Sequence, residues 1–332
     1  MALRLLEVTA PAGHLDTINA IADCPSVIQQ TVIPTDDKDV LQIQLLTRAQ
    51  GRQHLLDDLQ RVLGASDNWR ILLLPVDSAL PLREENDEEY EKQARQDRTN
   101  QTREELYNTT SGAAALTVDF ALMTVLAGIV AAVGLITDNT AAVIGAMVIA
   151  PLLSPNIALA LGAALGNWRL LLRGLGSLAV GVVIAVLLGF VVSRVMGHDT
   201  LSRELSLRVY GGFDSVVLAL AAGAAAALAL TSGISMTMVG VMVAVALMPP
   251  AVTVGIVLGM GRYRSAAGAA GLLIENVASV ILAAQAVFFY RGIRPKSWLE
   301  QRVAGQSSIL SAAVWLTLLA AALAEAIFVK PS

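Results

Sequence analysis

A carboxyl group and an amide group lie next to each other inside a long apolar stretch of this sequence. Glu275 and Asn276 stand in "GLLIENVASVILA", about ten residues after the stretch begins near Ala266. In a membrane helix that rises about 1.5 Å per residue, the pair would lie about 15 Å deep, close to the bilayer centre. Ionisable groups at that depth are costly and mark paths for ions or substrates. The pair indicates a protonation switch or a cation site, or else a neutral carboxyl hydrogen-bonded to a neighbouring helix or subunit.

Prolines interrupt two further apolar stretches. "AMVIAPLLSPNIALA" contains Pro151 and Pro155, and "VAVALMPPAVTVGI" contains Pro249 and Pro250. Proline inside a helix removes a backbone hydrogen bond and costs ~3 kcal/mol or more. Lipid offers no water to the freed carbonyl groups, so such a break persists only against protein or a wet cavity. Two related breaks favour a functional site over two simple kinks.

Polar side chains follow these prolines. Ser154 and Asn156 stand in the first stretch and Thr253 in the second. A helix that begins after a break points free N–H groups outward from its first turn, and its partial positive charge suits an anionic group. The same side chains could instead cap the broken ends. The candidate residues for binding a substrate or ion are Glu275, Asn276, Asn156, Ser154 and Thr253.

The composition places these stretches in a membrane. Hydrophobic residues make up 55% of the 332, which is too many for a soluble protein of this size. Seven apolar runs are close to the roughly 20 residues that a spanning helix needs. They lie near residues 116–136, 139–166, 170–195, 214–231, 234–260, 266–290 and 308–328.

The membrane region contains an internal repeat. Residues 119–169 align without gaps to residues 214–264, so that Asp119 falls on Asp214, Pro155 on Pro250 and Arg169 on Arg264. The sequence predicts a polytopic α-helical domain over residues 111–332, with two three-helix repeats whose central helices are broken. The repeats cover about 116–195 and 214–290, and an extra helix follows at about 308–328.

Two topologies of the repeats remain open. If 139–166 and 234–260 each cross the membrane, the repeats are inverted relative to each other. If these segments are re-entrant hairpins, the repeats run parallel. The length of the apolar segments favours crossing, whereas the distribution of arginines slightly favours hairpins.

The N-terminal part is acidic and has the pattern of a small soluble domain. Residues 1–110 hold 11 Lys and Arg against 19 Asp and Glu, whereas residues 111–332 hold 12 against 8. Strand-like and helix-like segments in residues 1–76 follow the order βαββαβ, which predicts an α+β ferredoxin-like domain. Such domains resemble ACT-type regulatory modules, although docking or assembly is the simpler role. Charged residues 77–110 predict an exposed helical connector.

Several protein classes are not expected. The first residues lack a signal-peptide pattern, so the N-terminal domain is expected in the cytoplasm and the chain in the inner membrane. One cysteine, Cys24, excludes an internal disulfide, and three scattered histidines form no metal-ligand cluster. Motifs for nucleotides or hydrolases and a basic patch for nucleic acid are absent from the sequence. We therefore expect no enzyme, cofactor, bound metal or nucleic acid, and we expect a homo-oligomer formed by glycine-rich helices or the cytoplasmic domain.

The stretch "DNTAAVIGAMVIAPLLSPNIALALGAALGN" resembles a known family. Together with "GLLIENVAS", it is similar to the bacterial and archaeal hydrophobic membrane proteins catalogued as domain of unknown function number 389. The likeness extends over roughly residues 110–290, and the N-terminal domain also suits the family. The resemblance implies a multi-pass inner-membrane protein and supplies neither a substrate nor catalytic residues.

The first functional hypothesis is a secondary transporter that binds a small solute or ion at the bilayer midplane, where the two broken helices meet. An oligomeric channel with re-entrant segments is the first alternative. A membrane scaffold or sensor that does not transport and carries a regulatory cytoplasmic domain is the second. The sequence leaves the substrate, the coupling ion and the direction of transport open.

Overall fold

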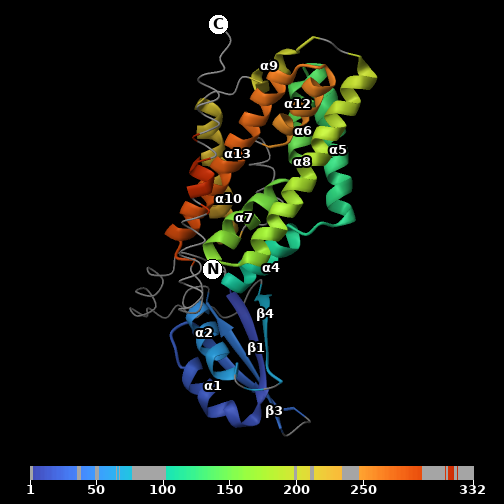
Figure 1. The fold of residues 1–332 in the computed structure, drawn as a ribbon. Helices are drawn as coiled ribbons and strands as arrows, with labels where there is room; N and C mark the ends of the chain where they lie inside the picture. The colour runs from blue at the N-terminus through green and yellow to red at the C-terminus, as the bar shows by residue number, and fades with distance from the viewer. Residues whose placement is uncertain are drawn as a thin grey trace. The chain divides into compact units, whose positions relative to one another are not determined.

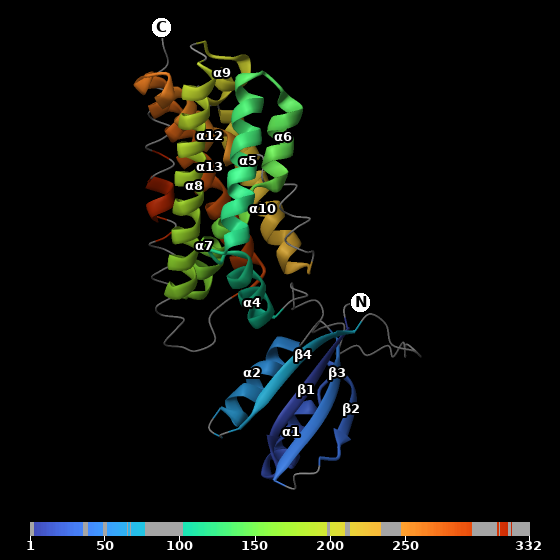
Figure 2. The same cartoon turned by 90° about the vertical axis from the view of Figure 1, so that its right-hand side faces the viewer.

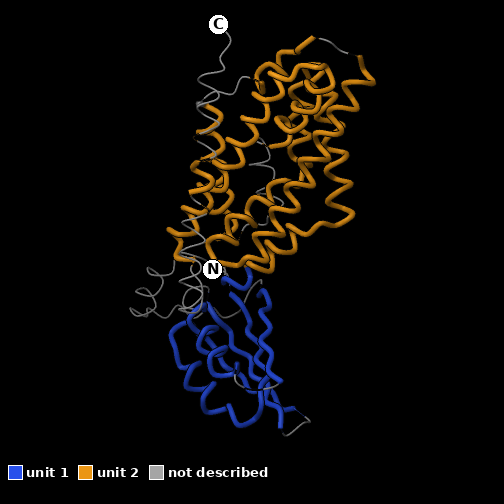
Figure 3. The backbone as a smooth tube through the Cα atoms, viewed as in Figure 1, with its two compact units in different colours: residues 1–105 blue, residues 106–332 orange. Residues whose placement is uncertain are grey.

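The computed structural model divides into two compact units, residues 1–105 and residues 106–332 (Figure 3). Figures 1 and 2 show the helices and strands of both units in two views. The structure describes residues 3–35, 39–48, 52–64, 66, 68–76, 102–197, 200–209, 213–233, 247–293, 311, 313–317 and 320.

Unit 1 is built on a four-stranded antiparallel sheet with the strand order β2-β3-β1-β4. The elements follow one another along the chain as β1, α1, β2, β3, α2 and β4, which is the predicted βαββαβ order. Their bounds are Leu3–Pro11 for β1, Leu15–Ala22 for α1, Val27–Ile33 for β2, Val40–Thr47 for β3, Arg52–Leu63 for α2 and Arg70–Val76 for β4, with a short 3-10 turn, η1, at Ala12–His14.

Alternating side chains give the sheet one buried face and one open face. Leu6 and Val8 of β1 and Ile43 of β3 are fully buried in a core that includes side chains of α1 and α2. The intervening residues form the open face, where Glu7 accepts hydrogen bonds from Gln42 and from its neighbour Gln44. The alternation of leucine and isoleucine with glutamine in the sequence predicts this arrangement.

Helix α4 (Arg103–Ala113) contains the boundary between the two units. Most of the predicted exposed connector, residues 77–101, lies outside the described residues. The described end is helical as expected, but it is not an exposed stalk, because Leu106 and Thr110 are fully buried. Opposite charges four residues apart predict an exposed helix only if those charges face water. Here Arg103 instead forms an ion pair with Asp57.

Unit 2 is helical and membrane-embedded. Four of its described helices are long and apolar enough to cross a bilayer, and α6 with α7 forms a fifth candidate, bent by 49° at the break between them. The first part of the predicted segment 234–260 and most of 308–328 lie outside the described residues. The helices are α5 (Val118–Ile136), α6 (Thr140–Ile149), α7 (Leu153–Leu165), α8 (Trp168–Met196), α9 (Arg203–Val209), α10 (Phe213–Thr231), α12 (Met248–Gly259) and α13 (Tyr263–Tyr290).

Helix α7 runs antiparallel to α8 and begins beside the middle of that helix. A Cβ atom on Gly181, near the centre of α8, would lie 2.5 Å from Leu152 at the start of α7. A Cβ on Gly162, near the end of α7, would lie 2.8 Å from the backbone nitrogen of Leu171, near the start of α8. Helix α7 therefore covers the first half of α8.

Helix α12 runs parallel to α8 and covers its second half. A Cβ on Gly189 would lie 2.2 Å from the carbonyl oxygen of Val252, and a Cβ on Gly259 would lie 2.8 Å from Ser193. Both half-helices therefore begin near the middle of α8 and run in opposite directions. In Figures 1 and 2, α7 lies toward the end of unit 2 that holds α4, and α12 toward the end that holds α9.

Apolar side chains on α8 face away from the protein core. Val183, Leu187 and Val191 follow one another at intervals of four residues and are 55%, 58% and 53% exposed. Residues four apart lie on one side of a helix, so these side chains form an apolar stripe of the kind that contacts lipid.

Candidate functional site

The break between α6 and α7 buries one polar side chain at the new helix start. Ala150 is extended after α6, and Leu152, the N-cap residue of α7, makes no side-chain capping hydrogen bond. The Asn156 Nδ2 group donates to the Leu152 carbonyl oxygen at 3.1 Å, and Asn156 is fully buried. Ser154 is only partly buried. Of the two polar residues predicted here, Asn156 lies deeper in the protein.

Helix α12 repeats this arrangement in the second half of unit 2. Its N-cap residue, Leu247, makes no side-chain capping hydrogen bond, and Pro249 and Pro250 occupy its first turn. Thr253 follows one turn later and is fully buried. Its hydroxyl has no hydrogen-bond partner within the described part of the chain. The residues that precede this half-helix, 234–246, lie outside the described residues.

The predicted pair of a carboxyl and an amide, Glu275 and Asn276, lies in the middle of α13. Glu275 and Asn276 are 2% and 5% exposed. Glu275 lies twelve residues after the first residue of this 28-residue helix, about 18 Å along the axis at 1.5 Å per residue. Ser279 is also fully buried, and sequence reasoning missed it. Ser279 follows Glu275 by four residues, and residues four apart share a helix face, so this spacing could have indicated that Ser279 lies beside the carboxyl.

Helices α8 and α13 hold the two half-helices together, because each of them packs against both α7 and α12. Asn156 and Thr253 therefore lie on half-helices that both contact α13, the helix of Glu275, and each of these residues is near mid-height of unit 2. The polar side chains there are one carboxyl, two amides and two hydroxyls, which belong to Glu275, Asn156, Asn276, Thr253 and Ser279. Such a set can bind a cation or hydrogen-bond a small polar solute.

The site is not symmetric between the two halves. The residue of α8 that corresponds to Glu275 in the sequence repeat is Val180. Val180 is 39% exposed, whereas Glu275 is buried. The carboxyl thus belongs to one half only, as the sequence predicts.

Comparison with known proteins places this arrangement in a family. The chain is 30% identical over 318 residues to an uncharacterized protein of Methanocaldococcus jannaschii, and the match covers 96% of this chain and 97% of that protein. Residues 147–282 match the family described as "Domain of unknown function (DUF389)". The chain belongs to this family. No solved structure matches it.

The DUF389 match includes both described half-helices and the Glu275–Asn276 pair of α13. It therefore covers every candidate binding residue of unit 2. The family description and the relative's name assign no activity, so the function must be argued from the site.

A polar cluster that the sequence did not predict connects the turn between α5 and α6 with α9. The Asp138 carboxylate accepts hydrogen bonds from the backbone N–H groups of Glu204 and Arg203, at 2.8 and 3.2 Å. The bond from Glu204 is the main reason why the pKa of Asp138 lies below its ordinary value. Glu204 in turn accepts from Thr140 and pairs with Arg208. The cluster fixes α9 across this end of unit 2.

A buried arginine marks unit 1. The Arg52 side chain is fully buried, and its Nη2 lies 3.3 Å from Glu105 Oε2, while Arg4 Nε lies 2.9 Å from Glu105 Oε1. Burial lowers the pKa of the Arg52 guanidinium, and the nearby Glu105 charge opposes that effect. The pattern of apolar residues does not predict the burial of Arg52, because it assigns only apolar side chains to the core.

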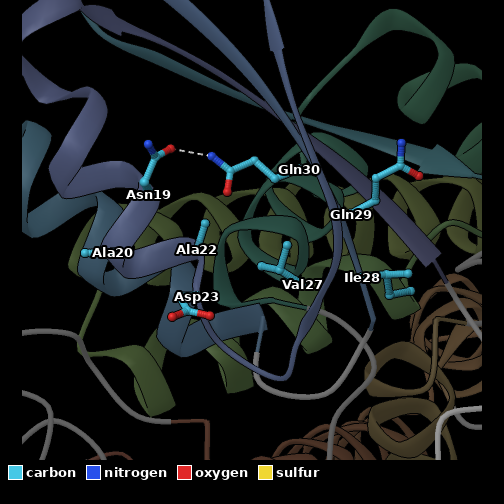
Figure 4. A pocket seen from close by; sticks show the side chains of 8 residues that line it. All are labelled: Asn19, Ala20, Ala22, Asp23, Val27, Ile28, Gln29 and Gln30. Atoms are coloured by element: carbon cyan, nitrogen blue, oxygen red, sulfur yellow. Dashed lines mark hydrogen bonds between the residues drawn. The ribbon is translucent and has the colours of Figure 1, made fainter.

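Unit 1 also carries an open pocket between the end of α1 and the edge strand β2 (Figure 4). Gln30 donates a hydrogen bond to Asn19 across it, and Asp23 adds a carboxylate. In the described parts of both units, no group of three or more His, Cys, Asp or Glu is placed to hold a metal. The pocket is lined by Asn19, Ala20, Ala22, Asp23, Val27, Ile28, Gln29 and Gln30.

Proposed function

We propose that this chain is a multi-pass secondary transporter that binds a small solute or ion in the middle of unit 2. The observation that carries the proposal is the pair of half-helices α7 and α12. Both begin with proline in the first turn, near the middle of α8, and they run in opposite directions. Discontinuous helices in corresponding positions of two inverted halves are the usual framework of a transporter's midplane site.

Helix bounds support the predicted duplication. Helix α5 (Val118–Ile136) and α10 (Phe213–Thr231) differ by 95 residues at both ends. The same displacement relates the first residues of α7 and α12 and those of α8 and α13. We infer that each repeat holds one whole helix, one broken helix and a second whole helix.

The packing of unit 2 favours broken spans over re-entrant hairpins. Helix α6 begins beside α9, where Thr140 bonds Glu204, close to the end of α8. Helix α7 ends next to the start of α8, where Gly162 packs against Leu171. The segment that contains both helices thus starts and finishes at opposite ends of a helix long enough to cross a bilayer.

We further propose that the chain lies in the inner membrane with its N-terminal domain in the cytoplasm. The acidic composition of residues 1–110 and the apolar stripe of α8 support this placement. We also propose that the chain forms a homo-oligomer. Leu72 and Leu74 favour unit 1 as its contact, since they are 41% and 42% exposed on the open face of the sheet.

The transport proposal predicts that Glu275→Gln lowers flux while the protein stays folded. The glutamine side chain has nearly the same shape but cannot carry the charge that would balance or move an ion. The measurement is uptake of labelled ions and metabolites by proteoliposomes that contain the wild-type chain or the variant. Uptake by the wild type that Glu275→Gln leaves unchanged would remove Glu275 from the mechanism.

The pocket of unit 1 supports a second role, in which the N-terminal domain senses a small molecule or docks a protein. If the chain is a sensor or scaffold rather than a carrier, deletion of residues 1–76 should abolish its function. In a carrier, the same deletion should alter regulation and leave basal uptake. An enzymatic role is not part of the proposal, because one buried carboxyl makes a poor catalytic set by itself.

A further inference from the structure

Three fully buried residues on α7, α12 and α13 each hold a side-chain oxygen atom that has no hydrogen-bond partner within the described residues. The three oxygens are Asn156 Oδ1 on α7, Thr253 Oγ1 on α12 and Ser279 Oγ on α13. All three residues are fully buried. Buried polar atoms in folded proteins are nearly always paired, so three such oxygens on α13 and on the two half-helices that pack against it require an explanation.

These oxygens lie near the same height as Glu275. Ser279 follows Glu275 by one turn on α13, so both side chains share a face of that helix. Asn156 lies in the first turn of α7 and Thr253 in the second turn of α12, and both half-helices begin at mid-height and pack against α13. Three helices therefore place neutral oxygens around the level of one carboxyl group.

The charges of this region favour a cation as the ligand. Within α5 to α8, α10, α12 and α13, every charged side chain other than Glu275 stands among the first or last six residues of its helix. Helices α7, α10 and α12 contain no Lys, Arg or His. An anion at this level would therefore meet a carboxyl group and no basic side chain from those helices.

Proline weakens the expected preference of the half-helix starts for an anion. That preference depends on the free N–H groups of the first turn. Pro155 removes one of these groups from α7, and Pro249 with Pro250 removes two from α12. The first turns are thus poor in donors, while the unpaired atoms nearby are oxygens.

We propose that Glu275, Asn156, Thr253 and Ser279 form a binding site for one alkali-metal cation, such as Na⁺, at mid-height of unit 2. Hard cations prefer carboxylate, amide and hydroxyl oxygens. A single carboxylate balances one positive charge, whereas a divalent ion would leave an uncompensated charge in an apolar surrounding. The ion's use as substrate or coupling ion rests on the transport function proposed above, but its binding does not.

The test measures the melting temperature of the purified full-length chain in detergent. NaCl replaces choline chloride in steps from zero to about 300 mM, so that the ionic strength stays constant. A ligand that binds only the native state raises the melting temperature by mass action. We expect a saturable rise of a few degrees in Na⁺ that choline does not produce. Glu275→Gln should abolish the rise.

Variants of three buried hydroxyl residues test whether a hydroxyl binds the cation or only contributes to packing. Thr253→Val should leave the melting temperature in choline unchanged or higher, because it removes an unsatisfied buried hydroxyl, and it should lose the rise in Na⁺. Ser279→Ala should behave in the same way. Thr124 is equally buried, but its hydroxyl donates to the Phe120 carbonyl oxygen at 2.7 Å. Thr124→Val should therefore lower the melting temperature in both salts and keep the rise.

Several results would overturn the cation site. One is a wild-type melting temperature that is the same in Na⁺, K⁺, Li⁺ and choline. Another is a rise in Na⁺ that survives in both Glu275→Gln and Thr253→Val. A melting temperature that follows pH but no metal ion would assign a proton instead. Binding of Na⁺ without any uptake by proteoliposomes would support the cation site and contradict the transport function. Uptake without any response of the melting temperature to alkali ions would support the transport function and contradict the cation site.

Discussion

At the scale of single residues, buried threonines in unit 2 are in two different states. Thr124 and Thr231 each donate to the carbonyl oxygen of the residue four positions earlier in their own helices. This is the common way for a helical threonine to satisfy its hydroxyl. Thr253 is equally buried, yet its hydroxyl makes no such bond in the described structure. The difference between these threonines is invisible in the sequence, where all three stand in apolar helices.

The Asp138 carboxylate gives a prediction about acid stability. Hydrogen bonds from the Glu204 and Arg203 backbones lower the pKa of Asp138 in the folded state. A lowered pKa means that the carboxylate stabilises the fold above its unfolded value of about 3.9, and that this contribution is lost as pH falls through the lower folded value. Asp138→Asn should therefore melt at a lower temperature than the wild type at neutral pH.

The difference between wild type and Asp138→Asn should depend on pH. It should stay constant from about pH 8 to about pH 5 and shrink at lower pH, as the wild-type carboxyl takes up a proton. Asparagine also tolerates the left-handed backbone of this residue, which has φ of 54°. Melting curves across this range measure the effect. A difference that persists unchanged to the acid end would show that the charge of Asp138 is not its cause.

At the scale of elements, close backbone contact holds α12 against α8. A Cβ on Gly255 would lie 2.0 Å from the Val186 carbonyl oxygen, a distance that real Cβ atoms do not reach. Gly255→Ala should therefore force the helices apart, at a cost on the order of 1–3 kcal/mol for overpacking. We expect a clear fall in the melting temperature of the detergent-solubilised protein.

Gly176 of α8 provides the matched control. A Cβ there would meet nothing within 4 Å. Gly176→Ala should be neutral or slightly stabilising, because alanine is a better helix former by roughly 1 kcal/mol. Equal effects of the two substitutions would mean that α8 and α12 are not in close contact.

Most elements could be predicted from local patterns in the sequence, but their contacts could not. Alternation in β3 and proline in the first turns of α7 and α12 are local signals, and the structure has the strands and helix starts where these signals put them. The burial of Arg52 and the capping of α9 by Asp138 depend on residues distant in sequence. The partner of each close-packed glycine, such as Val186 for Gly255, likewise depends on how the helices pack.

At the scale of the whole molecule, the transport proposal depends on how the two repeats cross the membrane. Helix α10 starts near α13, because a Cβ on Gly268 would lie 2.5 Å from the Val209 carbonyl oxygen, shortly before α10 begins. Farther along, Gly223 of α10 packs against Val280 of α13. The two helices therefore run parallel, as α5 and α8 do, which is the arrangement that the proposed inverted repeats require.

The most direct test is the sidedness of four turns. In a Cys24→Ser background, single cysteines replace Asn139, Asn167, Ser232 and Arg262, and a membrane-impermeant maleimide is applied to each face of sealed vesicles. Two inverted repeats with broken spans predict that the cysteines at 139 and 262 react from one face and those at 167 and 232 from the other. Reaction of the cysteines at 139 and 167 from the same face would make the broken segment a re-entrant hairpin and contradict the inverted architecture.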